Sequence, residues 1–138
     1  MRTVFWEDNQ VKMIDQRRLP GALEIAAYES HHEVAQAIRD MVVRGAPAIG
    51  AAAAFGLALA AQESKRSQRD ALLQDLEAAA LVLRSARPTA VNLGWAVDRM
   101  MGSAHKSQAQ GDALRRAVLA EAQRIADEDV EIYMIMVL

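Results

Sequence analysis

The sequence contains no cysteine, few aromatic residues and no excess of basic charge, and each shortage excludes a class of function. Without cysteine the chain forms no disulfide, thiolate metal site or cysteine nucleophile. Its aromatic content of 4% offers no platform for stacking the bases of a single-stranded nucleic acid. The 16 basic and 18 acidic residues give a net charge of -2, whereas nucleic-acid and membrane-surface binders carry a basic excess or stripe. We therefore expect neither a nucleic-acid partner nor a membrane partner.

Long hydrophobic runs are also scarce. The N-terminus lacks the apolar core of a signal peptide, which makes the cytoplasm the expected location. Residues 46–61 form the one extended apolar run, but it is mostly alanine and shorter than the roughly 20 residues that span a bilayer. We interpret this run as a buried helix. The length of 138 residues suits a single domain with a substantial core.

Residues 1–29 have the pattern of strands, and residues 30–138 have the pattern of helices. Three short β-rich runs separated by turn residues precede Ser30 and predict an antiparallel β-meander. Beyond it, apolar residues at helical spacing predict about five helices. The expected fold class is α+β and mostly α: an N-terminal β-meander subdomain, residues 1–29, packed on a helical bundle, residues 30–138. No parallel sheet is expected.

Capping residues predict where the helices begin. Ser30 and Glu33 form a capping box for the first helix, whose apolar spacing continues to Val42. Pro47 suits the first position of the second helix. By the same reasoning, the third helix is capped by Ser67 with Asp70, and the fourth by Thr89 with Asn92.

Two short runs each place an arginine where a helix is expected to begin. The first is Arg44-Gly45-Ala46-Pro47-Ala48-Ile49-Gly50, and the second is Arg87-Pro88-Thr89-Ala90-Val91-Asn92-Leu93. A helix start exposes unpaired backbone N–H groups at the positive end of the helix dipole, and arginine adds a planar cation that matches phosphate oxygens in pairs. The two runs therefore predict a binding site for a phosphorylated small molecule.

The free donors of the first run are expected to be the N–H groups of Gly45, Ala46, Ala48 and Ile49, since Pro47 has none. Glycine also lets the backbone approach a ligand closely. The alternative for both arginines is structural: a basic residue near a helix C-terminus interacts favourably with the dipole and with the last carbonyls.

The other chemically active residues are interpreted as structural. His31 and His32 are adjacent on a helix and point in different directions, so they do not chelate one ion, and no metal site is expected. His105 shows no partner. Asp15 fits a hydrogen-bonding role in a turn. A solvated acidic helix face is expected at Asp127, Glu128 and Asp129. Two isolated packing anchors are expected at Trp6 and Trp95.

The two arginine runs, together with Val4-Phe5-Trp6 and Ile14-Asp15-Gln16-Arg17-Arg18-Leu19-Pro20, resemble the N-terminal domain of the methylthioribose-1-phosphate isomerase family, which also includes regulatory subunits of the translation initiation exchange factor. The resemblance covers residues 4–129. It implies that Arg44, Gly45, Ala46 and Arg87 line the substrate site. The reaction it implies is the aldose–ketose isomerisation of 5-methylthioribose 1-phosphate to 5-methylthioribulose 1-phosphate in methionine salvage, without a cofactor.

The resemblance also implies what this chain lacks. In the family a cysteine and an aspartate of a second, larger α/β domain are catalytic, so none of the residues here is expected to be catalytic and the chain alone is expected to be inactive. Two alternatives remain: a related isomerase of deoxyribose 1-phosphate or ribose 1,5-bisphosphate, and a non-enzymatic helical interaction module. We further expect a homo-oligomer, with the apolar C-terminal run at residues 131–138 buried against another chain or folded back.

Overall fold

The chain begins with a three-stranded antiparallel sheet in the order β1-β2-β3. The computed structural model describes residues 2–137, with side chains for residues 2–128. Its strands are β1 (Val4–Glu7), β2 (Gln10–Ile14) and β3 (Ile25–Tyr28). Asp8 and Asn9 join β1 to β2 with φ values of 56° and 59°, the left-handed backbone that a two-residue hairpin turn requires. The predicted meander is confirmed.

Asp15 organises the loop between β2 and β3. It caps a short 3-10 helix, η1 (Gln16–Arg18), and its carboxylate accepts the backbone N–H of Arg17 at 3.0 Å. The Arg17 guanidinium donates two further hydrogen bonds to the same carboxylate, at 3.0 and 2.9 Å. These bonds hold the pKa of the Asp15 carboxyl below its usual range, although its burial opposes the shift. The predicted role in a turn is confirmed.

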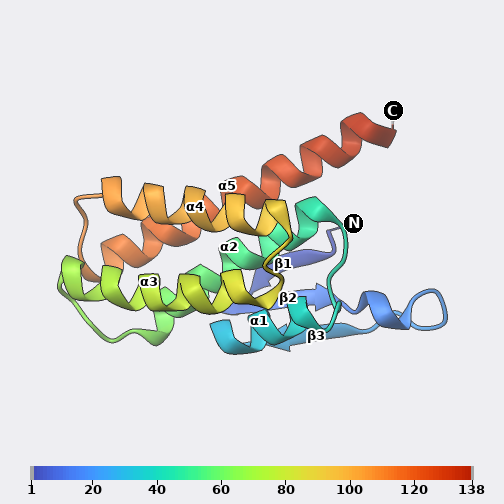
Figure 1. Cartoon of the computed structure of the whole chain (residues 1–138), viewed down its shortest axis with the longest axis horizontal. Coiled ribbons are helices and arrows are strands. Elements are labelled where there is room, and N and C mark those ends of the chain that lie inside the picture. The colour runs from blue at the N-terminus through green and yellow to red at the C-terminus, as the bar shows by residue number, and fades with distance from the viewer. Residues whose placement is uncertain (1, 138) are drawn as a thin grey trace.

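Five helices follow, and one of them forms the centre of the fold. Figure 1 shows α2 crossing the middle of the molecule with the sheet on one side and the other helices packed around it. Helix α2 contacts every other helix as well as β1 and β2. The last helix extends beyond the bundle toward the C-terminus (Figure 1). Their bounds are α1 (His31–Arg39), α2 (Ala46–Glu63), α3 (Arg69–Ala86), α4 (Val91–Lys106) and α5 (Gly111–Val137).

Helix α2 is buried continuously from residue 48 to residue 61, which confirms the predicted buried helix. By length and composition it is also the one helix among the described residues that could cross a membrane, yet 78% of it is buried inside the fold. An all-round apolar helix of this kind is the expected core of a bundle.

Glycines let the neighbouring helices approach α2. A Cβ atom placed on Gly56 would lie 2.9 Å from Cδ2 of Leu83 and 3.2 Å from Cγ1 of Val34. A Cβ atom on Gly50 would lie 3.4 Å from the backbone oxygen of Asn92. The helix that contains Asn92 is therefore packed close to α2 near the point where both helices begin.

Helix α1 starts where the sequence predicts, but it ends earlier than predicted. Ser30 Oγ accepts the N–H of Glu33 at 3.2 Å, and the Glu33 carboxylate accepts the N–H of Ser30 at 3.1 Å, which is the predicted capping box. The helix ends at Arg39, so the prediction that it continues to Val42 is wrong. The backbone turns at Met41, where φ is 64°.

The predicted caps of α3 and α4 are also wrong. Helix α3 begins after Gln68 and α4 begins after Ala90, and neither cap residue makes a side-chain hydrogen bond. Ser67 and Thr89 each precede these caps by one residue, and both are exposed. Burial of apolar residues in the first turns, Leu72 of α3 among them, fixes these helix starts in place of a polar cap.

Candidate functional site

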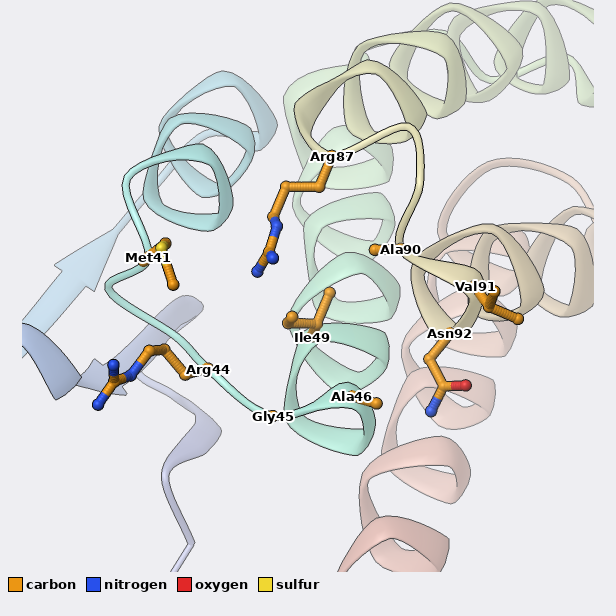
Figure 2. A pocket seen from close by; sticks show the side chains of 9 residues that line it. All are labelled: Met41, Arg44, Gly45, Ala46, Ile49, Arg87, Ala90, Val91 and Asn92. Carbon is orange, nitrogen blue, oxygen red and sulfur yellow. The ribbon is translucent and has the colours of Figure 1, made fainter.

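The two arginine runs meet at one hollow of about 400 Å³ between the starts of α2 and α4 (Figure 2). Loops and helix starts far apart in the sequence form its walls, and all four residues singled out from the sequence are among them. The lining residues are Met41, Arg44, Gly45, Ala46 and Ile49 on one side and Arg87, Ala90, Val91 and Asn92 on the other.

The start of α2 contributes free backbone donors to this hollow. Gly45 is the N-cap residue, with φ 92° and ψ 132°, a conformation that a residue with a side chain rarely adopts. Among the described residues, the N–H groups of Gly45, Ala46 and Ala48 have no backbone acceptor. Ile49 was expected to be a fourth donor, but its N–H bonds the carbonyl of Gly45 at 3.0 Å in the first helical turn, so that expectation is wrong.

The start of α4 contributes a second set of donors. The first helical hydrogen bond of α4 runs from the N–H of Gly94 to the carbonyl of Ala90, at 3.3 Å. The N–H groups of Val91, Asn92 and Leu93 come before this bond and are the unsatisfied donors of the first turn, and Val91 and Asn92 line the hollow. The positive ends of two helix dipoles therefore lie at the same hollow.

Arg87 is the cation that points into the hollow. Figure 2 shows its side chain extending between Met41 and Ile49, whereas the guanidinium of Arg44 points away from the centre. Arg44 is nevertheless one of the lining residues. Among residues 2–128 neither guanidinium has a carboxylate within salt-bridge distance, while Arg17 is paired with an aspartate. No lining residue is acidic.

The electrostatic character of the hollow follows from these groups. Two helix starts and Arg87 supply positive potential, and the wall carries no negative side chain to neutralise it. Ile49, which is 5% exposed, forms an apolar part of the wall beside this cation. The arrangement suits a small anion that carries an uncharged organic group.

A second hollow, also about 400 Å³, lies at the other end of α2, but its polar groups bind one another. His31 Nδ1 lies 3.0 Å from a Glu63 oxygen, and the His31 N–H donates to the same carboxylate at 2.7 Å. Ser64 Oγ donates to Asp75 at 2.6 Å. Among the described residues no three potential metal ligands lie together. His31 is therefore paired with a carboxylate, and not simply exposed as the sequence indicated.

Several other sequence interpretations change in detail. His105 lies in α4 and does have a partner, because its Nε2 is 2.6 Å from a Glu77 oxygen. Trp6 stacks on Phe55 with ring centroids 6.0 Å apart, as a packing anchor should. Trp95 is 52% exposed, so it is not an anchor, and the Arg99 guanidinium lies 5.5 Å from its ring centroid.

The acidic helix face near residue 128 is paired rather than merely solvated. Arg2 donates to Asp127, and Arg99 donates two hydrogen bonds to Glu128, at 2.8 and 2.5 Å. The Arg99 guanidinium lowers the pKa of the Glu128 carboxyl. The side chain of Asp129 and the expected burial of residues 131–138 lie outside the described side chains.

Met41 is the lining residue that sequence reasoning missed. The apolar spacing of α1 placed it on a helical core face, but it lies just past the helix end and is 42% exposed. Asp40-Met41 contains none of the glycine or asparagine that usually marks such a helix end, so the sequence offered no cue.

Comparison with known proteins places these features in a family. Residues 42–137 match the model of the initiation factor 2 subunit family. A methylthioribose-1-phosphate isomerase from Synechococcus sp. is 47% identical over 131 residues, which are 95% of this chain and 38% of that protein. The chain thus spans well under half the length of this curated relative.

Two solved structures share the fold. The 5-methylthioribose 1-phosphate isomerase from Pyrococcus horikoshii superimposes with a TM-score of 0.89 at 46% identity, over 94% of this chain and 37% of that one. The translation initiation factor eIF-2B subunit delta from A. fulgidus superimposes with a TM-score of 0.88 at 43% identity, over 95% and 38%. An enzyme and an initiation-factor subunit therefore both share this fold.

Proposed function

This chain belongs to the initiation factor 2 subunit family, and from that premise we propose that it is the substrate-binding part of a sugar-phosphate isomerase. The names of its relatives indicate that the substrate is 5-methylthioribose 1-phosphate. The proposed product is 5-methylthioribulose 1-phosphate. The observation that carries the proposal is the hollow where Arg87 and two helix starts converge without an opposing carboxylate.

In this proposal the hollow holds the phosphate group of the substrate. The guanidinium of Arg87 and the free N–H groups of Gly45 and Ala46 donate hydrogen bonds to phosphate oxygens. Arg44 joins them by rotating its exposed side chain inward, a motion that takes nanoseconds or less for surface residues. These contacts fix the sugar in one orientation, because a phosphate held from several sides does not turn freely.

The chemical step needs groups other than these. The reaction opens a ring that the 1-phosphate locks closed and then moves hydrogen from C2 to C1 of the sugar. The hollow presents arginines, backbone amides, the side-chain amide of Asn92 and apolar side chains, none of which is a general base at neutral pH. We therefore propose that residues 1–29 and 30–138 act together as one N-terminal domain that binds substrate, and that this chain alone does not turn it over.

Replacing Arg87 by alanine tests the proposal. Loss of a charge-assisted hydrogen bond is expected to weaken binding of methylthioribose 1-phosphate on the order of tenfold or more. The matched control is Arg116→Ala, which removes an exposed arginine of α5. Its neighbour Arg115 bonds the carbonyl of Ala61 near the C-terminal end of α2, and an 18-residue helix is roughly 27 Å long, so Arg116 lies far from the hollow. Isothermal titration calorimetry of the 138-residue chain measures both affinities.

The outcomes separate this function from its main rival. Loss of binding in Arg87→Ala with near-normal binding in Arg116→Ala supports the isomerase proposal. An equal, weak loss of binding in both variants indicates a nonspecific effect of charge. The similarity to an initiation-factor subunit favours a non-enzymatic interaction module as the second candidate, and such a module would bind no sugar phosphate at all.

A further inference from the structure

Met41 lies where a helix end normally requires glycine. The N–H of Val42 bonds the carbonyl of Ala37 at 3.0 Å, and the N–H of Met41 bonds the carbonyl of Ile38 at 3.3 Å. This pair of bonds is the Schellman motif, which places the residue after the cap in the left-handed conformation. Met41 has φ 64° accordingly. Glycine is the usual residue there, because a Cβ atom crowds the backbone in this conformation.

The methionine side chain is only partly buried. It is 42% exposed and belongs to the large hydrophobic side chains of the described structure that are open to solvent. The left-handed backbone disfavours a side chain here, and Met41 is not among the buried residues of the core. A residue that is unfavourable for the fold and is held next to a ligand-sized hollow points to a role in binding.

The side chain extends toward the hollow beside its cation. In Figure 2 Met41 and Ile49 lie on either side of the Arg87 side chain, and all three face the same space. Met41 comes from the end of α1 and Ile49 from the first turn of α2, so two elements supply apolar surface next to the phosphate-binding groups. A thioether is flexible and polarizable, and it donates no strong hydrogen bond.

We propose that Met41 determines specificity by packing against the apolar substituent of the bound sugar phosphate. The inference rests on the proposed function and adds to it the residue that distinguishes a methylthio group from a hydroxyl or a second phosphate. A methylthio group loses nothing by leaving water against Met41. A hydroxyl or phosphate at the same place loses hydrogen bonds to water that neither Met41 nor Ile49 replaces.

Two variants of Met41 and three ligands test the inference. Met41→Gly removes the side chain and suits the left-handed backbone, whereas Met41→Leu keeps an apolar side chain of similar volume. Dissociation constants of the 138-residue chain for methylthioribose 1-phosphate, ribose 1-phosphate and inorganic phosphate are measured by calorimetry, and thermal unfolding is followed by circular dichroism.

The wild-type chain is expected to bind methylthioribose 1-phosphate about threefold to tenfold more tightly than ribose 1-phosphate, as one apolar group in a partly open pocket allows. Met41→Gly is expected to abolish this ratio, to leave inorganic phosphate binding unchanged, and to raise the unfolding midpoint by a few degrees. Met41→Leu is expected to keep at least half of the ratio.

An unchanged ratio in Met41→Gly overturns the inference, and so does a lower unfolding midpoint, because the side chain would then be needed for the fold. Either result leaves the proposed function intact if Arg87→Ala still weakens phosphate binding. Failure of the wild-type chain to bind any of the three ligands overturns the proposed function and the specificity role together.

Discussion

At the scale of single residues, Asp15 and Arg17 show how one ion pair makes part of the fold pH-dependent. The Asp15 carboxylate is buried and accepts three hydrogen bonds from Arg17, one from its backbone and two from its guanidinium. These bonds lower the pKa of Asp15 in the folded state relative to the unfolded state. The stabilisation is therefore complete above the unfolded pKa and is lost as the pH falls through the folded pKa.

Asp15→Asn is expected to lower the free energy of unfolding at pH 7. The difference from wild type should begin to shrink below about pH 4, where the carboxyl of the unfolded chain takes up a proton, and it should keep shrinking until the pH passes the lower pKa of the folded state. Urea denaturation at pH values from 3 to 7 measures it. Asp70→Asn is the control, since that carboxylate is 91% exposed and contacts an arginine of the surface. A difference for Asp15→Asn that stays constant with pH would contradict the assignment.

Some residues of the site could be predicted from the sequence, and others could not. Arg87 and Gly45 were singled out because arginine and glycine beside a helix start have a specific physical meaning, and for Arg87 the resemblance to the isomerase family decided between binding and a structural role. Met41 was missed because its conformation depends on where α1 ends, and the sequence contains no cue for that end. The direction of the Arg44 side chain was also beyond prediction, since an exposed arginine has many rotamers of similar energy.

At the scale of elements, the packing of α2 depends on the size of its residues. Gly56 and Gly102 are both helical glycines, but only Gly56 is surrounded: a Cβ there meets Leu83 at 2.9 Å, whereas at Gly102 nothing lies within 4 Å. Gly56 thus belongs to a helix–helix contact that a methyl group would disturb, and Gly102 does not.

Gly56→Ala is expected to lower the free energy of unfolding by about 1–2 kcal/mol, since overpacking costs ~1–3 kcal/mol and the better helix propensity of alanine offsets part of it. Gly102→Ala is expected to raise it by about 0.5–1 kcal/mol, because only the propensity changes. Urea denaturation of the two variants measures both. Equal stabilisation by the two substitutions would contradict the close packing of α2 on α3.

Elements were predicted better than their ends. The alternation of β2 and the apolar spacing of the helices follow from burial on one face, which a sequence records directly. Starts and ends depend on a few hydrogen bonds and on packing from elsewhere in the chain. Ser30 is a cap because Glu33 completes its box, whereas Ser67 and Thr89 lie one residue too early and make no cap.

At the scale of the whole molecule, ion pairs fasten the last helix where it leaves the bundle. Arg2 before β1 bonds Asp127, and Arg99 of α4 bonds Glu128, both on α5. Exposed apolar side chains on α4 include Val91, 82% exposed, and Trp95, 52% exposed. Association into a homo-oligomer stays a prediction, as does the burial of residues 131–138.

The central claim is that the phosphate of a sugar phosphate binds between the starts of α2 and α4. Nuclear magnetic resonance of the ¹⁵N-labelled chain, titrated with methylthioribose 1-phosphate, tests it most directly because it reports on the backbone amides that are proposed as donors. We expect saturable shifts that are largest for the amides of Gly45, Ala46, Ala48, Val91 and Asn92. Largest shifts around His31 and Glu63 at the other end of α2, or no saturable shifts, would contradict it.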